Sequence, residues 1–461
     1  PVQPWKRIPT VEDYYAGRVA REEIAKVREE CKAKSASLYG ALMDKTGWPA
    51  IPFDGKAMRR QQTAAALGSI VFLISLSVLI LGLHQKQMLT VANLWVVSVL
   101  FSLLCFMTAC FTWYLAFSVP LKEYQQGRTI IDDPITVQKF IVDRTKLSQE
   151  HYGENPVFVP TGLYIQSLEF ASAHNVEVSG YVWQRFVKGR DDAVVRGFVL
   201  PEAKTFSVTE AYRQDLGKEE VVGWYFEALV RQAFDYSKYP FDHPNIELWL
   251  KPKDFSRHVV LVPDLGAYPV MSAGRLPGLQ GRLALPGYSF FGTFFSYEPR
   301  MRSANFGIPG KQMQSLIPEL FYNVLIKRNF ITPLIAKIFP IMIVLLMLFI
   351  VILSFSEDAE KQKSFGLTGL AVVGLVISFF FTTLLNQVDL RQQFGTDRVI
   401  FIENFNFVTY LILLLSAFQA FLFSAKHRIR FIQYQHCLIP KLLYWPIFTG
   451  LVLCLSLKYF Y

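Results

Sequence analysis

Residues 234–248 read FDYSKYPFDHPNIEL, and this stretch frames the interpretation of the whole chain. Runs rich in aromatic and aliphatic residues stand on both sides of its centre, GWYFEALVRQAF before and IELWLK after, so the stretch is expected to join two strands. Pro240 fixes φ at about −65° and favours a tight turn. Taken alone, the pattern fits an ordinary proline turn at the corner of a sheet, so the surrounding sequence must decide whether the turn has a further role.

The polar block that contains this turn, residues 120–329, has the pattern of a β-domain. Several of its runs are short, rich in Val, Ile, Tyr, Phe and Trp, and separated by Pro, Gly, Asn or Asp. They read VFVPTGLYIQSLEF, VEVSGYVWQRF, GWYFEALVRQAFDY, IELWLK and HVVLVPDL. Helical patterns are nearly absent from the block. Strands at this spacing predict a β-sandwich, a fold that hosts many functions and by itself specifies none.

The rest of the chain is apolar enough to predict a membrane protein. Of the 461 residues, 52% are hydrophobic and only 18% are charged, and the mean hydropathy is +0.27. Soluble domains keep about a quarter of their residues charged. Six apolar runs are each long enough, as helices, to cross about 30 Å of hydrocarbon. They are Ala64–Leu83, Val91–Val119, Phe330–Phe355, Phe365–Leu385, Phe405–Ser424 and Leu442–Phe460. The predicted fold class is a β-sandwich domain with a transmembrane domain of about six α-helices.

These runs divide the chain into four parts. Residues 1–63 form a polar head in which a surface helix is expected, and residues 64–119 form a transmembrane hairpin of two helices. The β-domain occupies residues 120–329, and four spans follow in residues 330–461. The polar opening PVQPWKRIPTVEDYY lacks the apolar core of a secretory signal, so insertion is expected to depend on the first span.

The second of the four last spans has a stripe of small and hydroxylated side chains at steps of three or four, which is one face of a helix. Its members are Ser364, Thr368, Ala371, Leu375, Ser378, Thr382 and Asn386. If several copies surrounded an axis, this face would line a water-filled path with an apolar constriction at Leu375. Close helix packing is the alternative, because small residues also let membrane helices approach one another.

The order of these parts resembles the pentameric ligand-gated ion channel superfamily, also called Cys-loop or Pro-loop receptors, over about residues 157–461. YPFDHPNIELWL is similar to the family's loop in which an aromatic-Pro-Phe-Asp turn links two strands, and bacterial members lack the cysteines there. VPTGLYIQSLEFASAHNVEVSGYVWQRF is similar to the first two strands of the family. LALPGYSFFGTFFSYEP resembles the strand before the agonist-capping loop, and PELFYNVLIKRNF resembles the strand that enters the membrane.

The resemblance gives the quoted stretch a role in coupling. Tyr239 and Phe241 would supply apolar anchors at the membrane surface, and Asp242 would pair with the pre-membrane arginine, Arg328. The loop would press on the connector that follows the pore helix, here residues 388–398. The expected coupling residues are Tyr239, Pro240, Phe241, Asp242 and Arg328.

The resemblance also implies a ligand site and a selectivity ring. Family members bind agonists between subunits in an aromatic box that attracts cations. The candidates here are Trp183, Trp224, Tyr225, Tyr288 and Phe291. Each fits a hydrophobic core equally well, and the family's WxPxxxxxN pattern has no counterpart near RGFVLPEAKTF. In SEDAEKQKS, Glu360 is the candidate for an acidic ring that favours cations, while Lys361 and Lys363 oppose its field.

The N-terminal head and hairpin depart from the family pattern. Two extra spans cross the membrane twice, so the head and the β-domain are expected on the same side of the membrane. The basic segments KHRIR and KAMRR favour opposite orientations, and the receptor topology favours a periplasmic or extracellular β-domain on a cell (inner) membrane. The expected partners are membrane lipid, further copies in a homopentamer, an unidentified small-molecule ligand, and an additional membrane or head-domain partner. The alternative function is a non-conducting accessory or scaffold subunit that keeps the receptor fold.

Other functional classes have little support in the sequence. The five cysteines have no CxxC spacing, the seven histidines form no HExxH motif, and neither a GxGxxG nor a Walker loop occurs. No enzyme activity, cofactor or metal site is therefore expected. The net charge of +10 comes from Lys and Arg spread along the chain and beside spans, which is typical of membrane orientation and lipid contact rather than of nucleic-acid binding.

Overall fold

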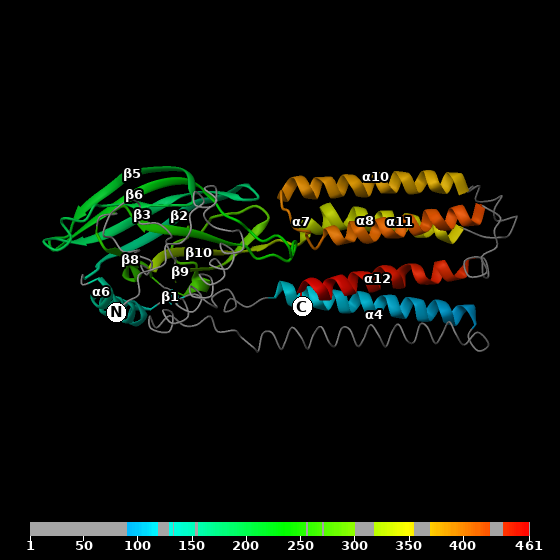
Figure 1. Cartoon of the computed structure of the whole chain (residues 1–461), viewed down its shortest axis with the longest axis horizontal. Helices are drawn as coiled ribbons and strands as arrows, with labels where there is room; N and C mark the ends of the chain where they lie inside the picture. The colour runs from blue at the N-terminus through cyan, green and yellow to red at the C-terminus, as the bar shows by residue number, and fades with distance from the viewer. Residues whose placement is uncertain are drawn as a thin grey trace, which may run out of the picture.

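The computed structural model describes residues 90–118, 129–131, 133–152, 155–254, 257–269, 272–299, 318–354, 369–424 and 437–460. Strands occupy one end of the molecule, and long helices extend from it side by side (Figure 1). The strands are β1 (Thr129–Ile131), β2 (Val157–Ser172), β3 (Asn175–Val187), β4 (Phe198–Val199), β5 (Ala203–Asp215), β6 (Glu219–Arg231), β7 (Asn245–Pro252), β8 (Val259–Pro263), β9 (Tyr288–Pro299) and β10 (Pro318–Arg328). The α-helices are α4 (Val91–Phe117), α6 (Pro134–Tyr152), α7 (Ile331–Pro333), α8 (Phe339–Ser354), α10 (Gly369–Phe394), α11 (Glu403–Ser424) and α12 (Leu438–Phe460).

The ten strands within the described ranges form two five-stranded sheets. One has the order β1-β9-β10-β7-β4, and the other has the order β5-β6-β3-β2-β8. β2 and β8 pair in parallel, and β3 pairs with β6 in an antiparallel register that sets Val182 opposite Trp224. Residues of both sheets, Trp224, Phe226, Leu248 and Tyr322 among them, join one hydrophobic cluster. Burial of alternate residues along β3 and β6 explains the apolar-polar alternation of their sequences.

Most predicted strands are present, but one expectation about the β-block was wrong. Residues 120–329 were expected to be nearly free of helix, whereas α6 is a helix of 19 residues. β-Branched residues such as Ile135, Val137 and Val142 give α6 a strand-like composition. β5 went unpredicted because it is an edge strand in which most residues are exposed and few, Phe206 among them, pack against the core, so its apolar alternation is weak.

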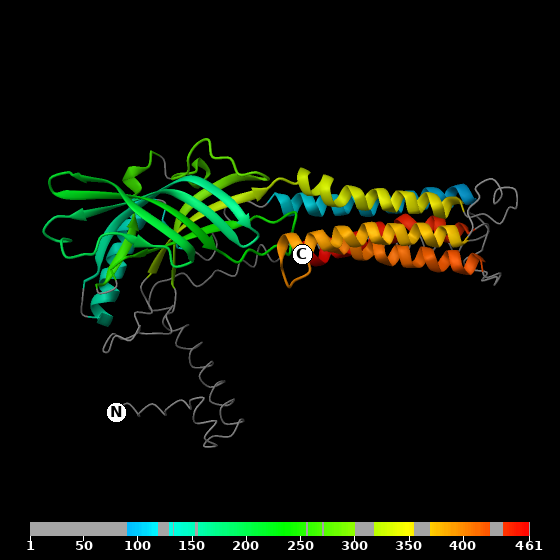
Figure 2. The same ribbon diagram turned by 90° about the horizontal axis from the view of Figure 1, so that it is seen from above.

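Among the residues that the structure describes, five helices are long and apolar enough to cross a membrane: Val91–Phe117, Ile331–Ser354, Ala371–Phe394, Glu403–Leu422 and Leu438–Phe460. Each matches a predicted span, except that α10 continues nine residues beyond the predicted end at Leu385, to Phe394. The sixth predicted span, residues 64–83, and the polar head lie outside the described residues. α10 and α4 lie on opposite sides of the helix bundle, and α4 packs beside α12 (Figures 1 and 2).

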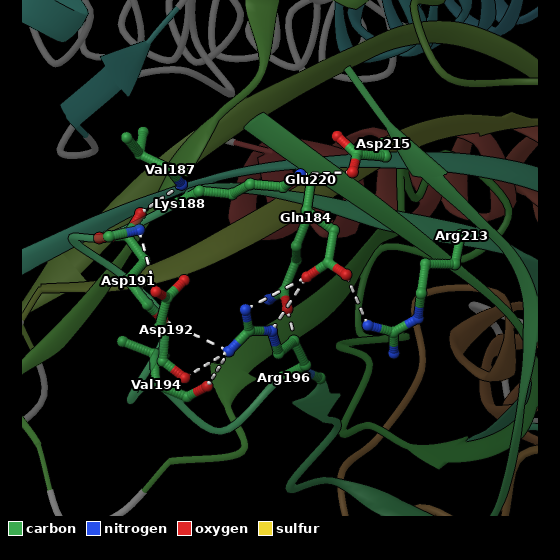
Figure 3. A network of polar contacts seen from close by, with 12 residues as sticks. Gln184, Val187, Lys188, Asp191, Asp192, Val194, Arg196, Arg213, Asp215 and Glu220 are labelled. Carbon is green, nitrogen blue, oxygen red and sulfur yellow. Dashed lines mark hydrogen bonds and ion pairs between the residues drawn. The ribbon is translucent and has the colours of Figure 1, made fainter. Parts of the chain in front are cut away.

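A polar network, drawn in Figure 3, lies where β6 begins, and the other end of β6 leads toward the helices (Figure 1). Arg196 donates to the backbone carbonyls of Asp192 and Val194 at 2.9 and 3.0 Å and forms an ion pair with Glu220 at 3.2 Å. Glu220 also accepts from Arg213 at 2.7 Å. The hydrogen bond from Arg213, followed by that from Arg196, holds the pKa of the Glu220 carboxyl below its ordinary value, although partial burial opposes this. The network fastens the loop after β3 to the β5–β6 hairpin.

Candidate functional site: the junction between sheets and helices

The loop between β6 and β7, residues 232–244, lies at the helix end of the sheets and contains the YPFD motif. We call it the β6–β7 loop. Its turn is closed by hydrogen bonds from the Tyr239 N–H to the Tyr236 carbonyl at 2.9 Å and from the Phe241 N–H to the Lys238 carbonyl at 2.8 Å. The peptide bond between Tyr239 and Pro240 is cis. Pro240 therefore sits within a tight turn, which places the side chains on either side of it against the helices.

Asp242 and Arg328 form a buried ion pair at the centre of this junction. Arg328 is the last residue of β10, and its Nε and one terminal nitrogen donate to the two carboxylate oxygens of Asp242 at 2.8 and 2.9 Å. The two side chains are only 10% and 3% exposed. Two parallel bonds fix the guanidinium relative to the carboxylate. The pairing implied by the resemblance is present, and its role in gating stays a prediction.

Four aromatic rings surround the guanidinium of Arg328. Its Cζ lies 4.6 Å from the ring centre of Tyr288, 4.7 Å from Tyr239, 5.9 Å from Tyr236 and 6.0 Å from Phe394. Burial lowers the pKa of Arg328, but the hydrogen bonds and charge of Asp242 more than reverse this, so the net shift is upward. Burial raises the pKa of Tyr239 and of Tyr288 to about 12, so both rings remain neutral at pH 7. The cation is thus held by one carboxylate and several π faces.

The β6–β7 loop contacts the end of α10 and the segment that follows it. The rings of Tyr239 and Tyr236 pack on Phe394, the last residue of α10, with centroids 4.5 and 4.8 Å apart. Beyond α10, the Phe401 N–H donates to the Ser237 carbonyl at 2.8 Å. The predicted contact between this loop and residues 388–398 is therefore present at Phe394.

Phe241 anchors the loop in the helix bundle. Its ring stacks on Phe330 at 5.2 Å and meets the edge of Phe460, near the end of α12, at 5.4 Å. It also lies 5.9 Å from Trp113 of α4 and 6.1 Å from Phe401. Phe241 is buried and belongs to the hydrophobic cluster of the helices. The loop is thus embedded between helices on several sides.

A second polar cluster ties the end of α10 to the neighbouring helices. Glu403, the first residue of α11, is fully buried and accepts from Arg391 at 2.8 Å and from Gln387 at 2.9 Å. Lys337 forms an ion pair with Asp389. Asp389 follows Thr382 by seven residues and so continues the face of the predicted stripe toward the β-domain. Sequence reasoning ended that stripe at Asn386 and missed this acidic residue.

The described part of the predicted stripe lies largely on the open side of α10. Ala371, Leu375, Ser378 and Thr382 are exposed in the single chain. Asn386 is half-buried and donates to Asn406 at 3.1 Å, so it turns toward α11. The other predicted members, Glu360, Ser364 and Thr368, lie outside the described residues.

The five predicted ligand residues fall into three groups rather than one box. Trp183 and Tyr225 lie on the outer face of the second sheet, where the Trp183 indole donates to Asp264 at 2.9 Å and Tyr225 meets Tyr181. Trp224 points the other way, into the core. Tyr288 and Phe291 belong to β9, where Tyr288 lies over Arg328 and Phe291 is 6.0 Å from His243. Although Trp183 and Tyr225 share this face, their ring contacts differ, because Trp183 meets Tyr268 with centroids 5.7 Å apart, and a single chain therefore does not form the predicted box.

Several junction residues escaped the sequence analysis. Tyr236 stood in the quoted stretch, and Phe394 stood in the predicted connector, but neither was singled out. Trp113 and Phe117, one helical turn apart at the end of the second span, have the positions of an interfacial aromatic belt, which was the available signal. Among the described residues, no group of three or more His, Cys, Asp or Glu side chains is placed to hold a metal ion. No protein-family model matches the chain, and no curated protein matches it.

Proposed function

We propose that this chain is a subunit of an oligomeric, ligand-gated ion channel of the Cys-loop type. In this proposal the two sheets form a β-sandwich on the periplasmic or extracellular side, ligand binds between the sandwiches of neighbouring subunits, and α10 lines the pore. A homopentamer is the proposed assembly, with closed head-to-tail interfaces. Ligand binding would favour one arrangement of subunits by its greater affinity for that arrangement.

The observation that supports this proposal most strongly is the junction around Asp242 and Arg328. β10 carries Arg328 and continues through residues 329 and 330 into the first span after the sheets. A displacement of this strand therefore acts on the ion pair and on that span. The β6–β7 loop carries Asp242 and packs on Phe394 at the end of α10. The buried ion pair of Asp242 and Arg328 therefore joins β10, which leads into the first span after the sheets, to the β6–β7 loop. That loop contacts α10, the helix that the proposal assigns to the pore.

The placement of α10 gives independent support. α10 lies at one side of the bundle (Figure 1), and its apolar stretch is 17% buried, whereas the other described spans are between 28% and 50% buried. An apolar helix left open in one subunit needs lipid or further protein against it. The hydroxyl groups of Ser378 and Thr382 on the open face suit a water-filled axis, and Leu375 suits its constriction. Glu360 remains the candidate for a ring that favours cations, whereas the charge of Asp389 is offset by its ion pair with Lys337.

The experiment that tests the proposal counts the subunits and compares cysteine substitutions at two adjacent threonines of α10. Thr382 is exposed on α10, whereas Thr383 is only 2% exposed and donates to the Phe379 carbonyl. After replacement of the five native cysteines, imaging of the purified protein should show five subunits around α10. A charged, membrane-impermeant thiol reagent should then block current in Thr382→Cys and leave Thr383→Cys unaffected.

The outcomes of that experiment separate the two candidate functions. A monomer, or α10 buried against other helices in the assembly, would contradict the channel proposal. The alternative, a non-conducting accessory subunit, is favoured by the bulky apolar side chains of Ile377, Phe380, Phe381 and Leu385, which are all exposed on α10. An accessory subunit would bury these side chains against a partner protein and would show no current that depends on Thr382.

A further inference from the structure

α4 ends beside the β6–β7 loop. We propose that α4 is a positioning element for this loop, acting through Trp113 and Phe117, so that the N-terminal part of the chain provides a second input to the gate. The proposal rests on the channel function stated above. It assigns a task to a helix that the receptor resemblance, which begins near residue 157, does not cover.

Trp113 joins the loop to two other helices. Its ring stacks on Phe241 with centroids 5.9 Å apart, and it also contacts Phe405 of α11 at 5.9 Å. Its indole N–H donates to the Ser456 hydroxyl of α12 at 2.9 Å. Ser456 is fully buried and in turn donates to the Val452 carbonyl, so its position is fixed. Because Phe405 and Ser456 hold Trp113 independently of the loop, the ring is a fixed surface against which Phe241 packs.

Phe117, one turn further along α4, contacts the other side of the ion pair. The Lys327 ammonium lies 3.4 Å from the centre of the Phe117 ring, a cation–π contact, and the His243 ring lies 6.3 Å from it. Lys327 immediately precedes Arg328, and His243 immediately follows Asp242. Trp113 and Phe117 therefore touch residues next to both members of the ion pair.

α4 is itself held firmly in the bundle. Ser98 donates to the Leu442 carbonyl of α12 at 2.5 Å, and Cys105 and Ala109 are fully buried. Beyond α4 the chain reaches β1, which pairs with β9 from Thr129 opposite Tyr297 onward. β9 also supplies Tyr288, whose ring covers Arg328. A shift of α4 would thus reach the junction through the aromatic contacts of Trp113 and Phe117.

The test compares side chains of α4 that contact the junction with exposed aromatic side chains of the same helix. Trp113→Leu and Phe117→Leu remove junction contacts, whereas Phe111→Leu and Tyr114→Leu alter side chains that are 59% and 65% exposed. Trp113→Phe keeps a ring and loses only the donor to Ser456, so it provides a conservative variant if Trp113→Leu fails to fold. Two readouts are needed: hydrogen exchange of residues 232–244 in the purified full-length protein, and channel current.

We expect Trp113→Leu and Phe117→Leu to speed hydrogen exchange in residues 232–244 and to shift the half-activating stimulus by about threefold to tenfold, the equivalent of one aromatic contact. The two control variants should leave the exchange rate and the half-activating stimulus unchanged. Trp113→Phe should give values between those of wild type and Trp113→Leu. Unchanged exchange, or an equal shift in the controls, overturns the proposal. Faster exchange in a protein that never conducts supports the positioning role of α4 and contradicts only the channel function.

Discussion

Two arginine–carboxylate clusters stand at opposite ends of β6, and they differ in how far water reaches them. At the start of the strand, Glu220 is shared by Arg196 and Arg213, and the three side chains are 18%, 23% and 46% exposed. Past its end, Asp242 and Arg328 are nearly sealed by aromatic rings. Exposed pairs contribute little to stability because solvent screens them. Breaking a buried pair leaves a charge without compensation, so the same chemical change should have unequal effects at the two ends.

The largest effect is expected at the sealed end. Asp242→Asn leaves the charge of Arg328 buried without its carboxylate and should reduce the free energy of unfolding by about 3–5 kcal/mol. In a channel it should also abolish gating. Thermal unfolding of the detergent-purified protein measures the loss, and Glu220→Gln is the matched control at the other end. A loss no greater than that of the control would mean that the aromatic rings, rather than the ion pair, hold the junction.

A second, smaller effect is expected where the loop meets α10. Phe394→Leu keeps an apolar side chain but removes the ring contacts with Tyr236 and Tyr239, and should cost about 1–2 kcal/mol. Phe381→Leu, at an exposed position on the same helix, is the control and should be nearly neutral. Current recordings should show a right-shifted response for Phe394→Leu only. Similar responses for both variants would contradict transmission through Phe394.

The sealed end should also respond to pH through His243. Burial, followed by the nearby charge of Lys327, lowers the pKa of His243 below its ordinary value of 6.5. As the pH falls, the unfolded chain therefore binds a proton at His243 at a higher pH than the folded chain does. The free energy of unfolding should consequently decrease as the pH drops below about 6.5. The comparison is the unfolding midpoint at pH 7.5 and pH 5.5 in wild type and His243→Gln. If the unfolding midpoint of the variant falls between the two pH values as much as that of wild type does, His243 is not the group that causes the pH dependence.

The smallest effect is expected at the exposed end. Glu220→Gln removes the charge that Arg196 and Arg213 share, and should reduce the free energy of unfolding by about 0.2–1 kcal/mol. High salt should narrow the difference between variant and wild type because these groups are partly solvated. A loss as large as that of Asp242→Asn would show that exposure is the wrong basis for the comparison.

Much of the local structure could be predicted because it depends on short-range patterns. The five described spans follow from continuous apolar runs, and β2, β3, β6 and β7 follow from alternation and aromatic content. α6 and β5 could not be predicted in this way. α6 is a helix with many β-branched residues, whose own preference is overridden by packing, including the stacking of Phe140 on Tyr297. β5 is stabilised by its pairing with β6 rather than by a buried face.

The site was only partly predictable. The resemblance implied the pair of Asp242 and Arg328, 86 residues apart in the chain. The rings that enclose Arg328 come from the loop, from β9 and from α10, so no local pattern joins them. Tyr288, predicted as a ligand residue, lies over Arg328. Trp224, predicted for the same site, belongs to the core.

By itself, the sequence determined which segments are apolar enough for a membrane, which alternate as strands, and where proline forces a turn. Hydrophobic periodicity and backbone restriction act over a few residues, so they can be read locally. Only the tertiary structure decided that Trp113 meets Ser456, 343 residues further along the chain, and that α4 lies against the β6–β7 loop. Such contacts depend on how complete helices and sheets pack together, and many pairings of apolar faces satisfy the same local pattern.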